Sequence, residues 1–228
     1  MAKRRTSGVQ RRERASSEAL NRRLNEPAGG MTLPDWRLLA IGAVLLVGVL
    51  LIVLVLILGS GPNPNAGVRQ PDDGTTHVAV GTVCRSPSQP CGPNPYSSTP
   101  GTSGPHWDPS GIADWGVYTE PRNETQLIHN LEHGGIVIWY DPDRASDEDV
   151  ATLTDFVQRQ VRQGIGGRYK WILTPWDGTD ELPSPIVATA WTWILELDSA
   201  DTGAIEAFAG EHYGIAPEPN GGPGPPAG

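Results

Sequence analysis

The chain has 228 residues and a formal net charge of −9, with 26 acidic residues against 17 basic ones. Residues 1–37 carry nine of the lysines and arginines and four of the acids, so the rest of the chain holds eight basic residues against 22 acids. An acidic main segment, preceded by a basic end too short to fold, excludes a nucleic-acid-binding protein.

Residues 36–59 are the first predicted element. They contain an uncharged run of 22 residues, 38–59, made mostly of Leu, Val and Ile. A helix rises about 1.5 Å per residue, so this run is long enough to cross a hydrocarbon core of about 30 Å. A secretory signal has a shorter apolar run, of about 7–15 residues, and a small-residue cleavage site that this sequence lacks. We expect a single uncleaved transmembrane helix and hence a membrane partner.

Charge predicts the orientation of this helix. Lysine and arginine are enriched on the cytoplasmic side, so residues 1–35 are expected to form a disordered basic tail in the cytoplasm. Residues 60–74 are rich in Gly, Pro and Asn and predict a linker. An extracytoplasmic domain is then expected over 75–215, followed by an unstructured Pro/Gly tail over 216–228. The sequence predicts a cell-membrane protein whose main domain lies outside.

The chain has two cysteines, Cys84 and Cys91, both in the predicted outer domain. An oxidising compartment permits a disulfide, and the six residues between them include two prolines and two serines. We predict a short-loop disulfide. The alternative is a pair of metal-binding or redox thiols, although the spacing is not C-x-x-C.

Within 75–215 the hydrophobic patterns predict both strands and helices. The expected extended segments are 77–83, a short piece at 115–118, 136–140, 169–175 and 186–195. A helix is expected over 146–163, because Ser146 suits an N-cap, three acids follow it and Gly164 can end it. A second, shorter helix is expected over 202–212.

Residues 85–114 are dominated by Pro, Ser, Gly and Asn. A free loop of this length is uncommon in a compact domain, so we expect the segment to be ordered against the core. The order of elements predicts an α+β fold with a single small, mainly antiparallel sheet and two helices, preceded by this long ordered loop and the transmembrane helix.

The segment 129–135 reads His-Asn-Leu-Glu-His-Gly-Gly. Histidines four residues apart lie on one face of a helical turn, so His129 and His133 could reach one metal ion. The pattern H-x-x-E-H is that of inverted zincins, but Gly134 and Gly135 would end a helix. We therefore expect the two histidines on at most one turn, leading into a strand.

Four separated motifs resemble those of a known family. They are Thr102-Ser103-Gly104-Pro105-His106, Trp115-Gly116-Val117-Tyr118, the segment 129–135, and Ala188-Thr189-Ala190-Trp191. In this order they resemble the DUF3105 family of membrane-anchored or secreted bacterial proteins of unknown function. The resemblance covers roughly 75–215 and implies an extracytoplasmic domain behind one N-terminal anchor. It supplies no activity, and it does not include the cysteine pair.

Three histidines form the candidate metal site: His106, His129 and His133. Neutral imidazole is the commonest metal ligand, and three histidines suit Zn or Cu as the cofactor. Glu132 is a candidate fourth ligand or catalytic base, or a hydrogen-bond partner of an imidazole N–H. His77 has no motif around it and is left out, as is His212.

Two alternatives to a metal centre stay open. The histidines and Glu132 could form a buried polar network in a non-catalytic envelope interaction or assembly module. A metal-dependent hydrolase is the other alternative, and it would need an open cleft at Glu132. A nucleophilic Ser103 is disfavoured, because its surroundings are not G-x-S-x-G. Trp191 and Trp193 are expected on one strand face, where they would bind an envelope partner if exposed and fill the core if buried.

Overall fold

The computed structural model describes residues 36–58, 63, 65–178 and 180–225, with the side chains of the first of these segments described over 40–53. The chain divides into two units, Met1–Gly61 and Pro62–Gly228. In the first unit helix α2 spans Trp36–Leu58. Among the residues described in full, no helix has the length and hydropathy that a membrane crossing needs. The anchor and its orientation stay predictions, and the tail predicted over 1–35 lies outside the described residues.

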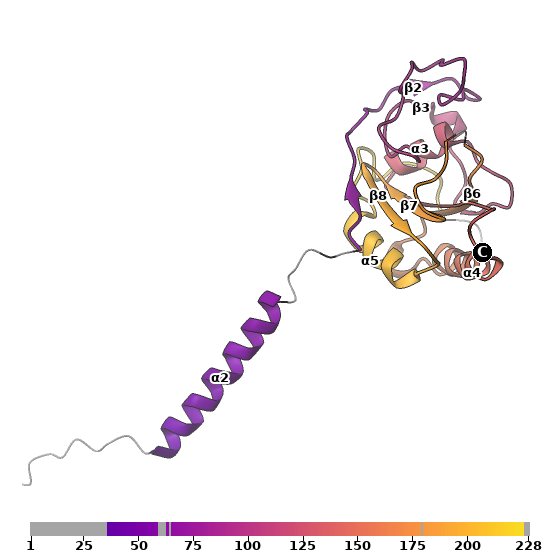
Figure 1. Ribbon diagram of the computed structural model, residues 1–228. Helices are drawn as coiled ribbons and strands as arrows, with labels where there is room; N and C mark the ends of the chain where they lie inside the picture. The colour runs from indigo at the N-terminus through magenta and orange to yellow at the C-terminus, as the bar shows by residue number, and fades with distance from the viewer. Residues whose placement is uncertain (1–35, 59–62, 64, 179, 226–228) are drawn as a thin grey trace, which may run out of the picture. The chain divides into compact units, whose positions relative to one another are not determined.

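A six-stranded mixed sheet forms the centre of the second unit (Figure 1), in the order β1-β8-β7-β5-β6-β4. Its strands are β1 (Val68–Arg69), β4 (Gly116–Val117), β5 (Ile136–Tyr140), β6 (Trp171–Pro175), β7 (Ile186–Ala190) and β8 (Trp193–Leu197). Strands β5, β6 and β7 are buried along almost their whole length, so they carry the core.

The α+β class is confirmed, but the single small sheet of the prediction is instead a mixed sheet of six strands, with three antiparallel and two parallel pairings, and a separate sheet of two strands. Strand β5 pairs antiparallel with β7 and parallel with β6, and β6 also pairs parallel with β4. Helix α4 (Asp147–Gln163) connects β5 to β6. A helical crossover of this kind returns the chain to the same end of the sheet, which makes the two strands parallel.

The strand predicted over 186–195 is instead two strands, β7 and β8, paired antiparallel. The chain turns at Trp191 and Thr192, and Thr192 has φ of 60°. Trp191 and Trp193 therefore do not share a strand face, because Trp191 lies in the turn and is 7 % exposed.

Both predicted helices are present. Helix α4 begins with a capping box between Ser146 and Asp149 and ends at Gly164, which has φ of 51°. Helix α5 spans Thr202–His212. A further helix, α3, spans Glu124–Glu132 with His133 as its C-cap, where the sequence predicted at most one helical turn. Its apolar side chains at 127, 128 and 131 are fully buried, and this burial supports a helix longer than the predicted turn.

The long Pro-rich segment is ordered against α3, as expected. It contains a short 3-10 helix, Pro109–Gly111, and strand β3 (His106–Trp107). Strand β3 pairs parallel with β2 (His77–Val78), so the strand predicted over 77–83 is reduced to its first two residues. The structure also contains the predicted disulfide, with 5.0 Å between the Cα atoms of Cys84 and Cys91.

Both ends of the domain pack more closely than their composition predicts. The expected linker contributes β1, which pairs with β8. Residues 216–225, expected to be unstructured, run back over the domain and are called the C-terminal strap below. Pro223 O accepts a hydrogen bond from Trp115 Nε1 at 2.9 Å, and Lys170 Nζ donates to Pro219 O at 2.8 Å and Gly221 O at 3.1 Å. Backbone carbonyls of the strap thus satisfy donors of the core.

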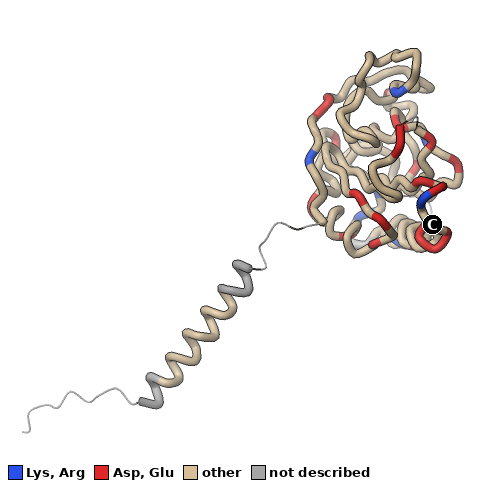
Figure 2. Tube along the Cα trace, viewed as in Figure 1, with Lys and Arg blue, Asp and Glu red and all other residues tan. Residues whose placement is uncertain are grey.

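Asp and Glu are spread over the loops and helix ends of this unit, whereas Lys and Arg are few and separate (Figure 2). The described surface is acidic, in keeping with the charge of the sequence.

Candidate metal centre

Four histidines meet where helix α3 ends beside β2 and β3. His129 and His133 come from α3 and its cap, and His106 comes from β3. His77 lies opposite His106 in the register of the parallel pair. The ring centroids are 4.8 Å apart for His77 and His106, 5.0 Å for His106 and His129, and 4.8 Å for His129 and His133.

The structure places His77 in the cluster, although no sequence motif surrounds this residue. One ligand atom from each of His77, His106 and His129 lies within 4.8 Å of the other two. His133 is not part of this trio and contacts it through His129. The predicted set of three is therefore brought together in part, with His77 beside His106 and His133 at the far side of His129.

The cluster is buried on every side but one. The side chain of His106 is fully buried, that of Glu132 is 2 % exposed, and His129 and His133 are also buried. The side chain of His77 is 40 % exposed. Solvent therefore reaches the cluster at His77. Glu132 does not lie in the open cleft that the hydrolase alternative requires.

Each of the three buried imidazoles has a backbone carbonyl at its Nδ1 atom. His106 Nδ1 lies 2.8 Å from Gly104 O, His129 Nδ1 lies 2.6 Å from Trp107 O, and His133 Nδ1 lies 2.8 Å from Glu218 O. A carbonyl oxygen can only accept, so Nδ1 carries the hydrogen in all three rings. A neutral imidazole has one N–H, and its Nε2 atom is then left with a lone pair.

The three Nε2 atoms face other acceptors. His129 Nε2 and His133 Nε2 are 3.0 Å apart. His106 Nε2 is 3.0 Å from the Oε2 atom of Glu132, which is also 3.6 Å from His77 Nε2. Two acceptors at such distances repel each other unless a proton or a cation lies between them. The predicted contact of Glu132 with an imidazole is present, and it is made to the Nε2 atom of His106.

Burial keeps the central rings neutral. Burial lowers the pKa of His106, although the Gly104 carbonyl and Glu132 oppose the shift. Burial also lowers the pKa of His129, against the Trp107 carbonyl, and the neighbouring His106 and His133 lower it further. An extra proton is therefore held weakly in this cluster. Neutral imidazole is the form that binds a metal ion.

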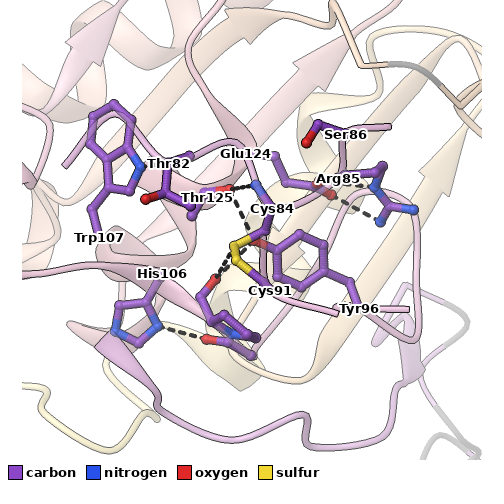
Figure 3. The surroundings of a disulfide bond; sticks show 12 residues. Thr82, Cys84, Arg85, Ser86, Cys91, Tyr96, His106, Trp107, Glu124 and Thr125 are labelled. Atoms are coloured by element: carbon purple, nitrogen blue, oxygen red, sulfur yellow. Dashed lines mark hydrogen bonds and ion pairs between the residues drawn. A yellow bond between two sulfur atoms is a disulfide. The ribbon is translucent and has the colours of Figure 1, made fainter. Parts of the chain in front are cut away.

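A second buried polar cluster lies at the other end of α3, beside the disulfide (Figure 3). Arg85 Nε and Nη2 lie 2.9 Å and 3.2 Å from the two carboxylate oxygens of Glu124. Thr125 Oγ1 accepts hydrogen bonds from Cys84 N at 3.0 Å and from Tyr96 OH at 3.1 Å. We call this set the Arg85–Glu124 cluster. It fastens the long Pro-rich segment to α3.

A family model described as protein of unknown function, DUF3105, matches residues 88–223. The match covers more than half of the chain and confirms the resemblance carried by the four motifs. It includes His106, His129, Glu132 and His133, and it begins after His77. No curated protein and no solved structure matches the chain.

Proposed function

The chain belongs to the DUF3105 family of proteins of unknown function, and on this premise we propose a function from the geometry of the site. We propose that the domain binds a transition metal, Zn or Cu, through the histidine cluster formed by His77, His106, His129 and His133.

The observation that carries this proposal is the orientation of the buried rings. Metal-binding histidines commonly donate the N–H of one ring nitrogen to a carbonyl, which presents the lone pair of the other nitrogen to the ion. His106, His129 and His133 each have this arrangement. Ligands of one zinc ion lie about 2.0–2.1 Å from it, and so within about 4.2 Å of each other. The trio, within 4.8 Å, needs a small contraction to meet this limit.

The rival function is an envelope interaction module in which these residues are a structural network. Such a network is stable when every buried donor meets an acceptor. The contact between His129 Nε2 and His133 Nε2, at 3.0 Å, joins two acceptors. A cation between such atoms favours the folded state, and this observation supports metal binding over the rival.

The proposed location is the extracytoplasmic side of the cell membrane, behind an anchor over 36–59. The uncharged run of that segment and the basic residues before it support this location. The Cys84–Cys91 disulfide supports it independently, because disulfides persist in oxidising compartments.

Elemental analysis of the full chain, purified without a histidine tag, tests the proposal. We expect bound Zn or Cu that is lost in the double variant His106→Ala, His129→Ala. His212→Ala is the matched control, because His212 is also buried, but its Nε2–H donates to the Ala66 carbonyl and its ring stacks on Trp193. It should keep the metal. Absence of bound metal after incubation with Zn²⁺ and Cu²⁺, in a folded protein, would support the structural network instead.

A further inference from the structure

Five side chains of the cluster carry ligand atoms, and their shortest contacts do not all meet at one atom. Ligands of a single ion lie within about 4.2 Å of each other. The shortest contacts, of 3.0 Å to 3.6 Å, form two groups that share no atom. One group consists of His106 Nε2 and His77 Nε2 around Glu132 Oε2, and the other consists of His129 Nε2 and His133 Nε2.

We propose that the cluster binds two divalent transition-metal ions, the first held by His77, His106 and Glu132 and the second by His129 and His133. This inference rests on the metal-binding function proposed above and assigns its ligands and stoichiometry.

The first position has a carboxylate at its centre. Glu132 Oε2 is 3.0 Å from His106 Nε2 and 3.6 Å from His77 Nε2, so a modest adjustment admits an ion among the three atoms. Two imidazoles and one carboxylate form a common ligand set for Zn²⁺. The carboxylate also supplies negative charge where a dication would enter a buried site.

The second position lies between histidines one helical turn apart. Their Nε2 atoms are 3.0 Å apart, and a tetrahedral ion with bonds of about 2.0–2.1 Å would hold them about 3.4 Å apart. The spacing therefore needs little change. The Glu218 carboxylate, 4.0 Å from His133 Nδ1, adds negative charge at this end of the cluster. Water would complete the coordination of the ion.

A single ion would leave part of the cluster unsatisfied. An imidazole Nε2 has one lone pair, so it binds one ion. If one ion took His77, His106 and His129, the Nε2 atom of His133 would keep a lone pair in a buried site without a donor. Two ions satisfy all five side chains. The trio's atoms, within 4.8 Å of each other, then belong to neighbouring ions, and paired ions in proteins lie about 3.5–4 Å apart.

Metal counting on the full chain tests this assignment. The variants are His133→Asn and His106→Asn, because the amide of Asn retains a donor near the position of Nδ1 and lacks Nε2. The control is His212→Ala. After saturation with Zn²⁺ and removal of loosely bound ions, elemental analysis should give two Zn per wild-type or control chain and one per chain in each Asn variant. Circular dichroism establishes that each variant is folded.

Three results would overturn parts of the assignment separately. One Zn per wild-type chain, kept by His133→Asn, would overturn the second position and leave the proposed function standing. Two Zn per chain in His133→Asn would overturn the ligand assignment. No Zn in the folded wild-type protein would overturn the proposed function itself. If an Asn variant does not fold, the wild-type protein is loaded with Co²⁺ and its magnetic susceptibility is measured. Two adjacent Co²⁺ ions couple magnetically, whereas a single ion does not, so the absence of coupling would overturn the two-ion assignment.

Discussion

Helix α3 has a buried polar cluster at each end, and the two clusters differ in how their atoms are matched. In the Arg85–Glu124 cluster a guanidinium meets a carboxylate, and Gly101 N also donates to that carboxylate at 2.5 Å. At the other end, the lone pairs of His129 and His133 face each other. The first network is complete without a ligand, whereas the second needs a proton or a metal ion. Donor–acceptor matching therefore separates a structural cluster from the proposed binding site, although both are buried and both are polar.

The largest expected effect is a loss of folding stability when the Arg85–Glu124 cluster of α3 is disrupted. Burial raises the pKa of Glu124, and Arg85 is the main group that opposes this shift. Arg85→Met leaves the carboxylate buried without its partner, so we expect a loss of about 3–5 kcal/mol in the free energy of unfolding. Urea denaturation measures this loss. The double variant Arg85→Met, Glu124→Gln should recover at least half of it, and a single variant as stable as wild type would show that the pair contributes little.

Added metal should stabilise the protein by binding to the histidine cluster at the C-terminal end of α3. An ion that binds the folded state alone, at 100 times its dissociation constant, adds about 2.7 kcal/mol to the free energy of unfolding. The increment should be the same in wild type and in Arg85→Met, because the two clusters share no side chain, and it should vanish with a chelator. Thermal denaturation with and without Zn²⁺ measures it. An increment that survives in the variant His106→Asn, His129→Asn would place the metal elsewhere.

A smaller effect is expected from pH in the metal-free protein. Burial lowers the pKa of His106 and His129 below the ordinary value of 6.5. Below about pH 6.5 the unfolded chain then binds more protons than the folded one, so the free energy of unfolding decreases as the pH falls, by up to about 1.4 kcal/mol per unit of pKa difference. Urea midpoints at pH 7.5, 6.5 and 5.5 measure this slope. His129→Asn should flatten it, and an unchanged slope would assign it to other groups.

Local patterns in the sequence are sufficient to predict the ends of some helices and the positions of some residues of the candidate site. Ser146 and Gly164 mark the ends of α4, and the spacing of His129 and His133 places them on one helix face. His77 reaches the site through a parallel pair of two-residue strands whose partners are far apart in the chain, and no local pattern records such a pairing. His77, the exposed member of the cluster, is therefore absent from the site predicted from the sequence.

Two other differences between the predicted and the observed structure have equally specific causes. The turn between β7 and β8 places Thr192 at φ of 60°, and its Trp-Thr sequence has none of the residues that ordinarily mark a turn. The C-terminal strap is held by its backbone carbonyls, as in the hydrogen bonds from Lys170 Nζ to Pro219 O and Gly221 O. Every residue type has such a carbonyl, so a Pro/Gly composition could not show that the strap binds to the domain.

The junction between α3 and β5 has a consequence for how the site opens. His133 is separated from the central strand by Gly134 and Gly135, and a Cβ atom on Gly135 would come within 2.5 Å of the Trp115 ring. Amide hydrogens of α3 should therefore exchange with solvent at the slow rate of β5, in events that unfold the whole core. Those of β2, a two-residue strand at the solvent side of the cluster, should exchange quickly by local fraying. A metal ion bound as proposed would then be released from the His77 side, while the helical histidines stay in place.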